Sequence, residues 1–123
     1  METQELKTKR QAFLDNTLAY FNSSTRCVDG TNCQYAPTAT SEGCALGRKM
    51  EDKELCAELD TMSVNATDKR VIGALPVEIQ ELGVEFLYSL QKLHDNKFNW
   101  TETGLSEKGQ DAVQIIKNGY INY

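Results

Sequence analysis

The chain has 123 residues and is acidic, because 18 Asp and Glu outnumber 13 Lys and Arg for a formal net charge of −5. This length predicts one domain, residues 1–123, that buries about two-thirds of its unfolded surface without needing disulfides or metals. The negative charge argues against direct binding to nucleic acid or to anionic membranes. No apolar run approaches the ~20 residues of a membrane span, and residues 1–10 are too polar for a signal peptide. We therefore expect a cytoplasmic protein.

The four cysteines are Cys27, Cys33, Cys44 and Cys56. Without an export signal, the reducing cytosol is the expected compartment, and the thiols are expected to be reduced. Their spacings do not include the two-residue knuckle that zinc sites usually repeat. We therefore expect no metal and no cofactor, and thiols that pack as small apolar groups.

The N-terminal half predicts three helical segments separated by irregular chain, and the second of them begins at Ser41 and Glu42 and continues through Leu46. Over the first twenty or so residues, Leu6, Phe13, Leu14, Leu18 and Phe21 share one face of an amphipathic helix. Between residues 26 and 40 the composition changes to Cys, Gly, Asn, Pro and Thr, which favours a small β-hairpin near residues 26–36. Residues 51–60 then form a short acidic helix with a narrow apolar side, and residues 61–74 form a connection with a short extended piece at 70–72.

The longest helical pattern runs from Leu75 to Trp100. Its apolar residues recur at three- and four-residue spacing and are Ile79, Leu82, Phe86, Leu87, Leu90 and Leu93. We predict a central helix from about Pro76 to His94, with Pro76 in the first turn. Gly83 falls inside this helix, which indicates close approach of another backbone.

A last helix is predicted after Ser106, which can cap its N-terminus. Glu107 would occupy the first turn, where the helix dipole favours a carboxylate. Together these patterns predict a mainly α, compact single-domain protein of about four to five helices, with at most one small hairpin, near residues 26–36.

The only histidine, His94, is the one candidate for imidazole chemistry. It lies one turn after Leu90 on the apolar face, so the alternative is a packed histidine bonded to a carbonyl or to Asp95. A Cys–His nucleophilic pair needs a thiol beside this ring, and no cysteine-hydrolase motif is present. The segment of residues 43–47 contains two glycines, but it has neither the spacing nor the lysine of a phosphate-binding loop. We therefore expect no catalytic residues and no enzyme activity.

Six short motifs are spread over most of the chain. They are Cys33-x-Tyr35, Gly43-Cys-Ala-Leu-Gly-Arg48, Glu54-Leu-Cys56, Leu75-Pro76, Leu90-Gln-x-Leu-His-Asp95 with Trp100, and Gly104-Leu-Ser106. Together they resemble a set of small proteins common in bacteriophages and prophages, a family with no established activity. The resemblance implies a mobile-element origin and the host cytoplasm as location, and it supplies no catalytic residues.

Such an origin implies a non-catalytic accessory protein that binds a host protein, for example an inhibitor of a defence system such as CRISPR. The expected partner is a basic, nucleic-acid-handling protein that contacts the densest carboxylates, at Glu51, Asp52, Glu54, Glu58 and Asp60. These carboxylates alternatively form an ordinary solvated face, or a site for a divalent cation, although no glycine-centred calcium loop is present.

Two other functions stay open. One is a small-ligand or nucleotide-binding protein, with a pocket formed by His94, Asp95, Trp100, Cys33 and Tyr35. The other is a structural accessory protein of the virion. A convergent polar pocket would favour the first of these, and a broad exposed acidic surface favours the binder.

Overall fold

The computed structural model describes residues 4–22, 28–29, 32–33, 35, 43–62 and 67–122. Six α-helices, two 3₁₀-helices and four short strands lie in these ranges. They are α1 (Gln4–Tyr20), β1 (Val28–Asp29), β2 (Asn32–Cys33), η1 (Gly47–Lys49), α2 (Lys53–Met62), α3 (Lys69–Gly73), α4 (Val77–Gln80), α5 (Val84–Asp95), η2 (Lys97–Asn99), β3 (Trp100–Thr101), β4 (Gly104–Leu105) and α6 (Glu107–Tyr120).

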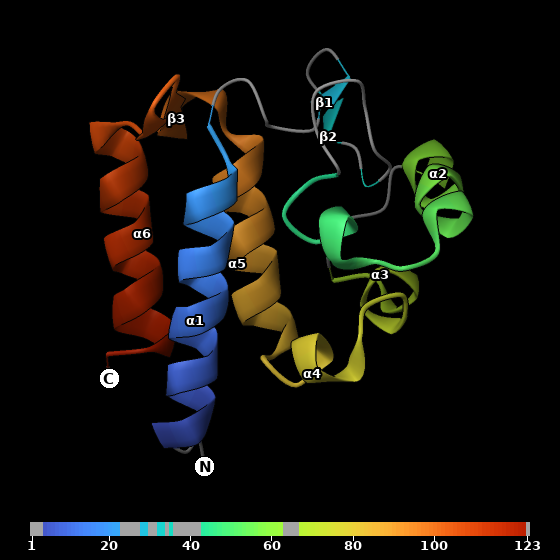
Figure 1. The fold of residues 1–123 in the computed structure, drawn as a ribbon, viewed down its shortest axis with the longest axis horizontal. Helices are drawn as coiled ribbons and strands as arrows, with labels where there is room; N and C mark the ends of the chain where they lie inside the picture. The colour runs from blue at the N-terminus through green and yellow to red at the C-terminus, as the bar shows by residue number, and fades with distance from the viewer. Residues whose placement is uncertain are drawn as a thin grey trace.

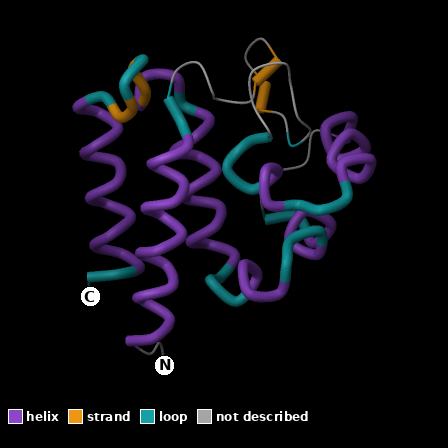
Figure 2. The backbone as a smooth tube through the Cα atoms, in the orientation of Figure 1, coloured by secondary structure: helices purple, strands orange, loops and turns teal. Residues whose placement is uncertain are grey.

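The mainly helical fold class is confirmed. Helices α1, α5 and α6 run side by side, whereas η1, α2 and α3 lie beyond α5 on its other side (Figure 1). The two strand pairs lie toward the same end of the molecule (Figure 2). The described part of the chain contains more α-helices than the four to five expected. Two short helices account for the difference: α4 is separate from α5, and α3 forms where an extended piece was expected.

The first of these differences lies at Gly83. The predicted central helix is divided into α4 and α5, and Gly83 stands at the N-cap of α5 with φ of +99°. This left-handed backbone is easily reached only by glycine, so Gly83 lies at the start of α5 and not in the middle of one long helix. The apolar row of the central stretch survives the break, because Phe86, Leu87, Leu90 and Leu93 are all buried on α5.

The second difference is α3, which replaces the extended piece expected at residues 70–72. The carboxylate of Asp68 accepts a hydrogen bond from the backbone N–H of Arg70 and so caps a helix over Lys69–Gly73. An N-cap of this kind satisfies a donor that the first turn otherwise leaves without a partner. The local cap therefore overrides the strand preference of Val71 and Ile72.

The hairpin near residues 26–36 is confirmed, with Val28 paired to Cys33 and Asp29 to Asn32 in antiparallel register. A second antiparallel hairpin, β3–β4, pairs Trp100 with Leu105 between α5 and α6. The expectation of at most one hairpin was therefore wrong. Strands of two residues are too short to show a period-two hydrophobic pattern, which explains why the sequence did not reveal β3 and β4.

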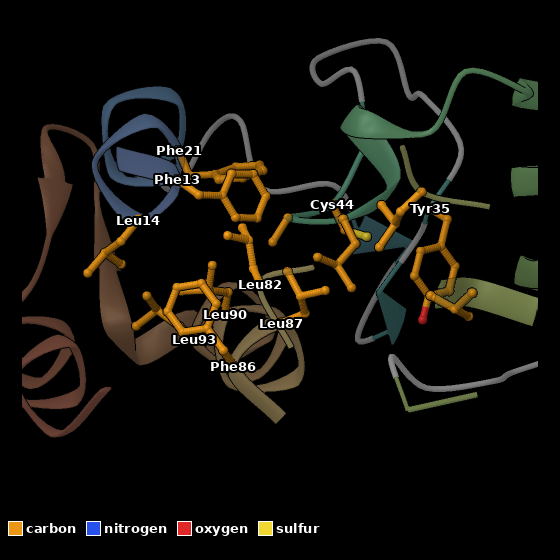
Figure 3. Packing of buried hydrophobic residues seen from close by; sticks show 14 of the residues in the cluster. Phe13, Leu14, Phe21, Tyr35, Cys44, Leu82, Phe86, Leu87, Leu90 and Leu93 are labelled. Carbon is orange, nitrogen blue, oxygen red and sulfur yellow. The ribbon is translucent and has the colours of Figure 1, made fainter. Parts of the chain in front are cut away.

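The buried apolar side chains form a cluster that reaches from α1 to α6. Figure 3 shows Phe13 and Phe21 of the N-terminal segment facing Phe86 and Leu90 of α5, while Leu87 lies toward Cys44. Each fully buried side chain of this size contributes about 1.5–3 kcal/mol of transfer free energy. Helix α5 is therefore central to the packing, as its apolar pattern predicted.

A buried arginine joins three parts of this cluster. Arg10 of α1 is only 4% exposed, and its Nε donates to the carbonyl oxygen of Leu82 at 2.9 Å. Its Nη1 donates to the carbonyl oxygen of Tyr120 at 3.0 Å, and the guanidinium lies 5.4 Å from the ring centroid of Phe86. The side chain thereby connects α1 both to the turn before α5 and to the end of α6.

Candidate functional site

His94 is fully buried near the end of α5. Its Nδ1 lies 2.9 Å from Oδ1 of Asp95, and its ring meets the ring of Phe21 edge-on at a centroid distance of 4.8 Å. This is the packed arrangement with Asp95 that the sequence favoured over a reactive imidazole. A ring without solvent access contributes to the core and does not present itself to a substrate.

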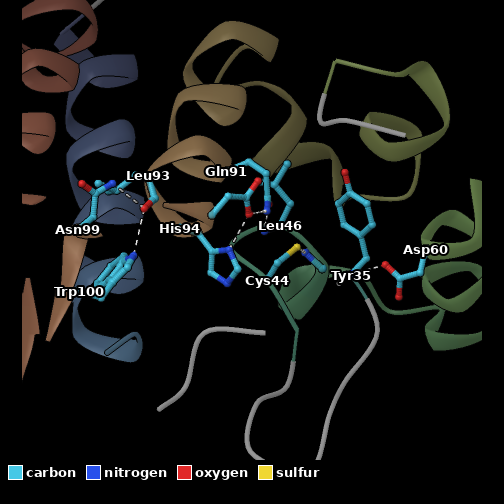
Figure 4. Close-up of polar contacts among 11 residues, drawn as sticks. Tyr35, Cys44, Leu46, Asp60, Gln91, Leu93, His94, Asn99 and Trp100 are labelled. Carbon is cyan, nitrogen blue, oxygen red and sulfur yellow. Dashed lines mark hydrogen bonds and ion pairs between the residues drawn. The ribbon is translucent and has the colours of Figure 1, made fainter. Parts of the chain in front are cut away.

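Gln91 continues the polar contacts along the same helix (Figure 4). Its Nε2 donates to Oδ1 of Asp95 at 2.8 Å, so one carboxylate oxygen is shared by the amide and by His94. Its Oε1 accepts a hydrogen bond from the backbone N–H of Leu46 at 3.3 Å. Gln91 therefore joins α5 to the segment that precedes η1, and both of its amide atoms are used in holding the fold.

Close packing and backbone conformation explain the glycines of residues 43–48. A Cβ on Gly47 would lie only 2.2 Å from the carbonyl oxygen of Tyr35, and Gly43 has φ of +137°. Arg48 extends back over α1, where it donates to Oδ1 of Asn16 and to Oγ1 of Thr17, each at 2.8 Å. These contacts give Gly47 and Arg48 of this motif a structural role in the tertiary fold.

Two other members of the alternative ligand set, Trp100 and Tyr35, lie on opposite sides of His94 (Figure 4). Trp100 is buried, donates through Nε1 to the carbonyl oxygen of Leu93 at 3.0 Å, and lies on one side of His94 in Figure 4. Tyr35, also buried, lies on the other side, beyond Cys44. Cys33 is placed on β2, and its side chain lies outside the described residues. Their burial gives Trp100 and Tyr35 packing roles.

The cysteines that the structure describes with their side chains, Cys44 and Cys56, are buried and not joined in a disulfide. Desolvation raises the pKa of the Cys56 thiol, although the nearby ammonium of Lys53 opposes the shift. A raised pKa leaves little of the reactive thiolate at neutral pH. Cys27 lies outside the described residues. Within the described ranges, no three His, Cys, Asp or Glu side chains come together as metal ligands.

Three carboxylates of α2 and its approach, Glu51, Glu54 and Glu58, point into solvent. We call them the α2 acidic face. In the described part of the chain the carboxylate groups of these three residues take part in no ion pair and no hydrogen bond. Lys53, the lysine of this helix, instead donates to the carbonyl oxygen of Gly47 at 3.1 Å. The face therefore keeps its negative charge uncompensated.

The remaining two carboxylates of the expected partner-binding set hold structure. Asp52 accepts hydrogen bonds from the backbone N–H groups of Glu54 and Leu55, both at 3.1 Å, and so caps α2. Asp60 is half-buried and accepts a hydrogen bond from the backbone N–H of Tyr35 at 2.7 Å. These bonds fix the position of α2, because Asp52 caps its N-terminal end and Asp60 holds its C-terminal part to Tyr35.

A groove between α5 and α6 was not predicted from the sequence. It has a volume of about 300 Å³ and is lined by Ser89, Lys92, Leu93, Asn99, Ala112, Ile115 and Ile116. The available signal was the pair Ile115–Ile116 on an amphipathic helix, because two adjacent residues cannot both face the same core. Ile116 is buried, whereas Ile115 is 73% exposed and forms part of the groove wall.

No protein-family model matches the sequence, and neither a curated protein nor a solved structure does. Among the helices of the described ranges, none combines the length and the apolar character that crossing a bilayer requires. The function is therefore inferred from the residues of this chain.

Proposed function

We propose that the protein is a non-catalytic binder whose α2 acidic face contacts a basic surface of another protein. The observation that carries this proposal is the exposure of three carboxylates without compensating partners, Glu54 and Glu58 on α2 and Glu51 just before it, at the margin of the fold (Figure 1). A solvated charge needs no partner for stability. Three of one sign on a rigid helix also form a field that a cationic surface can match.

The rigidity of the face supports the proposal. Cys56 and Leu59 anchor α2 in the core, and Asp52 and Asp60 fix its start and its contact with Tyr35. A helix held in this way loses little conformational freedom when it binds, so more of the interaction energy contributes to affinity. Charge complementarity acts mainly on the association rate and on the choice of partner.

The resemblance to phage and prophage proteins suggests which partners to test first. Proteins that handle nucleic acid carry basic surfaces, and a row of carboxylates can occupy the place of phosphates on such a surface. We propose a host protein of this class, for example a CRISPR effector, whose inhibition would follow from that occupation. The location that this implies is the host cytoplasm.

The two other functions are less well supported. A small-ligand site around His94, Trp100 and Tyr35 would need these side chains to be accessible, and all three are buried. A structural role in the virion would use the same exposed carboxylates, but its partners would be particle proteins. The identity of the captured partner separates this role from that of a host-directed binder.

The test is affinity capture from host lysate followed by quantitative mass spectrometry and measurement of the association rate. The decisive variant is Glu54→Lys with Glu58→Lys. The matched control is Glu5→Lys with Glu102→Lys, which changes net charge equally at exposed positions outside α2. We expect the α2 variant to associate at least tenfold more slowly at low salt, the control to retain most of the rate, and added salt to slow the wild type.

A His94→Ala variant provides a second comparison, because loss of a buried ring should lower stability and leave partner affinity unchanged at temperatures where the variant is folded. The proposal is wrong if capture recovers no protein partner. It is also wrong if the α2 reversal leaves affinity untouched while His94→Ala abolishes activity on a small molecule.

A further inference from the structure

Asn99, one of the residues that line the groove between α5 and α6, has a buried polar atom without a partner in the described structure. Asn99 is 4% exposed, and its Nδ2 donates to the carbonyl oxygen of Leu93 at 3.0 Å. Its Oδ1 is buried and has no hydrogen-bond partner within the described structure. Figure 4 shows this oxygen on the side of the amide away from the Leu93 carbonyl. A buried amide oxygen is normally satisfied, so Oδ1 of Asn99 is able to accept a further hydrogen bond.

Apolar side chains form most of the remaining lining of the groove, together with Ser89 and Lys92. Leu93 and Ile116 form its buried part, Ala112 is half-buried, and Ile115 stands 73% exposed at the edge. Close to the turn between the two helices, Phe98 is 64% exposed. Contiguous exposed apolar residues of this kind mark interaction surfaces. A groove between two neighbouring helices is moreover complementary in shape to a third helix.

Three lysines lie on or beside the elements that form the groove. Lys92 lines the groove, and the ammonium groups of Lys97 and Lys108 lie 5.2 and 5.3 Å from the ring centroid of Phe98. Lys108 precedes Ala112 by one helical turn, so it continues the row that forms the α6 wall. Asp111 and Glu85 are exposed nearby, but no carboxylate is among the lining residues.

We propose that this groove binds an acidic amphipathic helix of a partner protein and receives from it an aromatic side chain with a polar hydrogen, tryptophan or tyrosine. The aromatic body would fill the space between Leu93 and Ile116, and its N–H or O–H would donate to Oδ1 of Asn99. Carboxylates of the same helix would meet Lys92, Lys97 and Lys108. Aromatic anchors of this type dominate the energetics of many interfaces. The site is separate from the α2 acidic face, so either proposal can fail alone.

The test uses synthetic peptides of about 15 residues, long enough to form a helix on binding. The first peptide has leucines at three- and four-residue spacing, a central tryptophan in that row, and glutamates on the other face at one end. The second is identical except for 1-methyltryptophan, which removes the N–H and adds a methyl group. The third replaces the glutamates with lysines. Fluorescence anisotropy of the labelled peptides with the full-length protein gives the affinities.

We expect the tryptophan peptide to bind and the 1-methyl peptide to bind about tenfold more weakly, as for the loss of one buried hydrogen bond. Simple adhesion to an apolar surface predicts the opposite, because the added methyl group is apolar. The lysine peptide should bind at least tenfold more weakly at low salt because it repels the three lysines.

The protein variant is Ile115→Glu, which places a charge in the groove wall at an exposed position that the fold tolerates. Its matched control is Val77→Glu on α4, where an exposed apolar residue lies outside the groove. We expect the first variant to abolish peptide binding and the second to leave it unchanged.

Several outcomes would overturn the proposal. They are no binding of the tryptophan peptide, equal or tighter binding of the 1-methyl peptide, and equal binding by Ile115→Glu. Binding of free indole without binding of the peptide would assign the groove to a small ligand instead. Sedimentation of the protein alone that shows a dimer, lost in Ile115→Glu, would assign it to a second copy.

Discussion

Helices α5 and α2 each carry a row of apolar side chains, but α5 buries six of its twelve residues and α2 only two of its ten. The difference follows from position, because α5 has neighbours on several sides whereas α2 lies at the margin (Figure 1). The packing of the core constrains which side chains a buried position can hold. We therefore expect stability to depend mainly on α5 and its neighbours, and recognition to depend on helices that keep a free face.

The arginines show the same contrast. Arg10 is buried and donates to the carbonyl oxygens of Leu82 and Tyr120. Arg70 on α3 is exposed and pairs with Asp68 at 2.9 Å. A buried charge that loses its partners is costly, whereas an exposed ion pair contributes little because water and salt screen it. The same residue type therefore stabilises the two regions to very different degrees.

The largest predicted effect is at the centre of α5. Phe86→Ala or Leu90→Ala should lower the free energy of unfolding by about 2–5 kcal/mol, because both side chains are fully buried and their removal leaves a cavity. Val77→Ala, at an exposed position on α4, is the control and should change it by less than about 0.5 kcal/mol. Urea unfolding followed by circular dichroism measures all three. Losses below about 0.5 kcal/mol at both α5 positions would refute the central role of this helix.

The next effect is at Arg10. Arg10→Ala should cost about 2–3 kcal/mol, because it leaves two carbonyl oxygens, of Leu82 and Tyr120, without donors in a partly buried site. Arg10→Lys should restore only part of this loss, since one ammonium cannot reproduce the planar fork of the guanidinium. Arg70→Ala on α3 is the matched control and should cost much less than Arg10→Ala, because water and salt screen an exposed ion pair. Thermal unfolding ranks the stability of the three variants. An equal loss of stability in Arg10→Ala and Arg70→Ala would contradict the difference proposed between the buried and the exposed arginine.

Two glycines should respond with opposite signs to the same substitution. Gly83→Ala should destabilise by about 1–2 kcal/mol, because its φ of +99° is strained for a residue with a Cβ. Gly119→Ala lies near the end of helix α6, where an added Cβ meets nothing within 4 Å, and should stabilise by about 0.5–1 kcal/mol. Equilibrium unfolding of the two variants checks the sign. A stabilising Gly83→Ala would mean that the helix runs on through this position.

The apolar face of α5 and the cap of α6 were predictable because each depends on a local pattern. Leu90 repeats at helical spacing from Phe86, and Ser106 directly precedes a helical row and accepts a capping hydrogen bond from the backbone N–H of Gly109 within one turn. The break at Gly83 was not predictable in the same way. The apolar residues on either side of a glycine keep the same helical spacing whether the glycine lies inside one helix or at the N-cap of a second. Arg10 was missed although it lies at helical spacing from Phe13, because its burial depends on distant carbonyls.

The candidate sites were predictable only in part. Exposure of Glu54 and Glu58 follows from their place opposite the narrow apolar side of a helix. Asp60 belonged to the same charge run, yet it binds the backbone of Tyr35, a contact between residues 25 apart in sequence. The groove beside Asn99 forms between two helices, and no single segment carries a pattern for it. Local periodicity therefore identifies which residues face the core and does not identify their tertiary polar partners.

A smaller, pH-dependent effect is expected at Asp68 in the marginal region. The hydrogen bonds from Arg70 lower the pKa of Asp68 from 3.8 to about 2. A carboxylate whose folded pKa is lowered stabilises the fold above its unfolded pKa, and this contribution disappears as pH falls from about 4 toward 2. NMR titration of the Asp68 carboxyl carbon should show the low pKa, and Arg70→Ala should return it toward its ordinary value. An unchanged pKa in that variant would show that Arg70 is not the cause.

The smallest effect on stability is expected where we propose the largest effect on binding. Glu54 and Glu58 are one turn apart on α2, so they repel each other weakly, and two lysines in their place repel equally. Lysine at Glu54 is less favourable in the first turn, whereas lysine at Glu58 is nearer the C-terminal end, where a cation is favoured. The double reversal should therefore change the free energy of unfolding by less than about 0.5 kcal/mol. Glu58→Lys alone should stabilise slightly, by about 0.3–0.5 kcal/mol, because it creates a Glu–Lys pair in the favourable order. If the double reversal instead destabilises the protein as much as Leu90→Ala does, the α2 acidic face is part of the fold and is not free to bind.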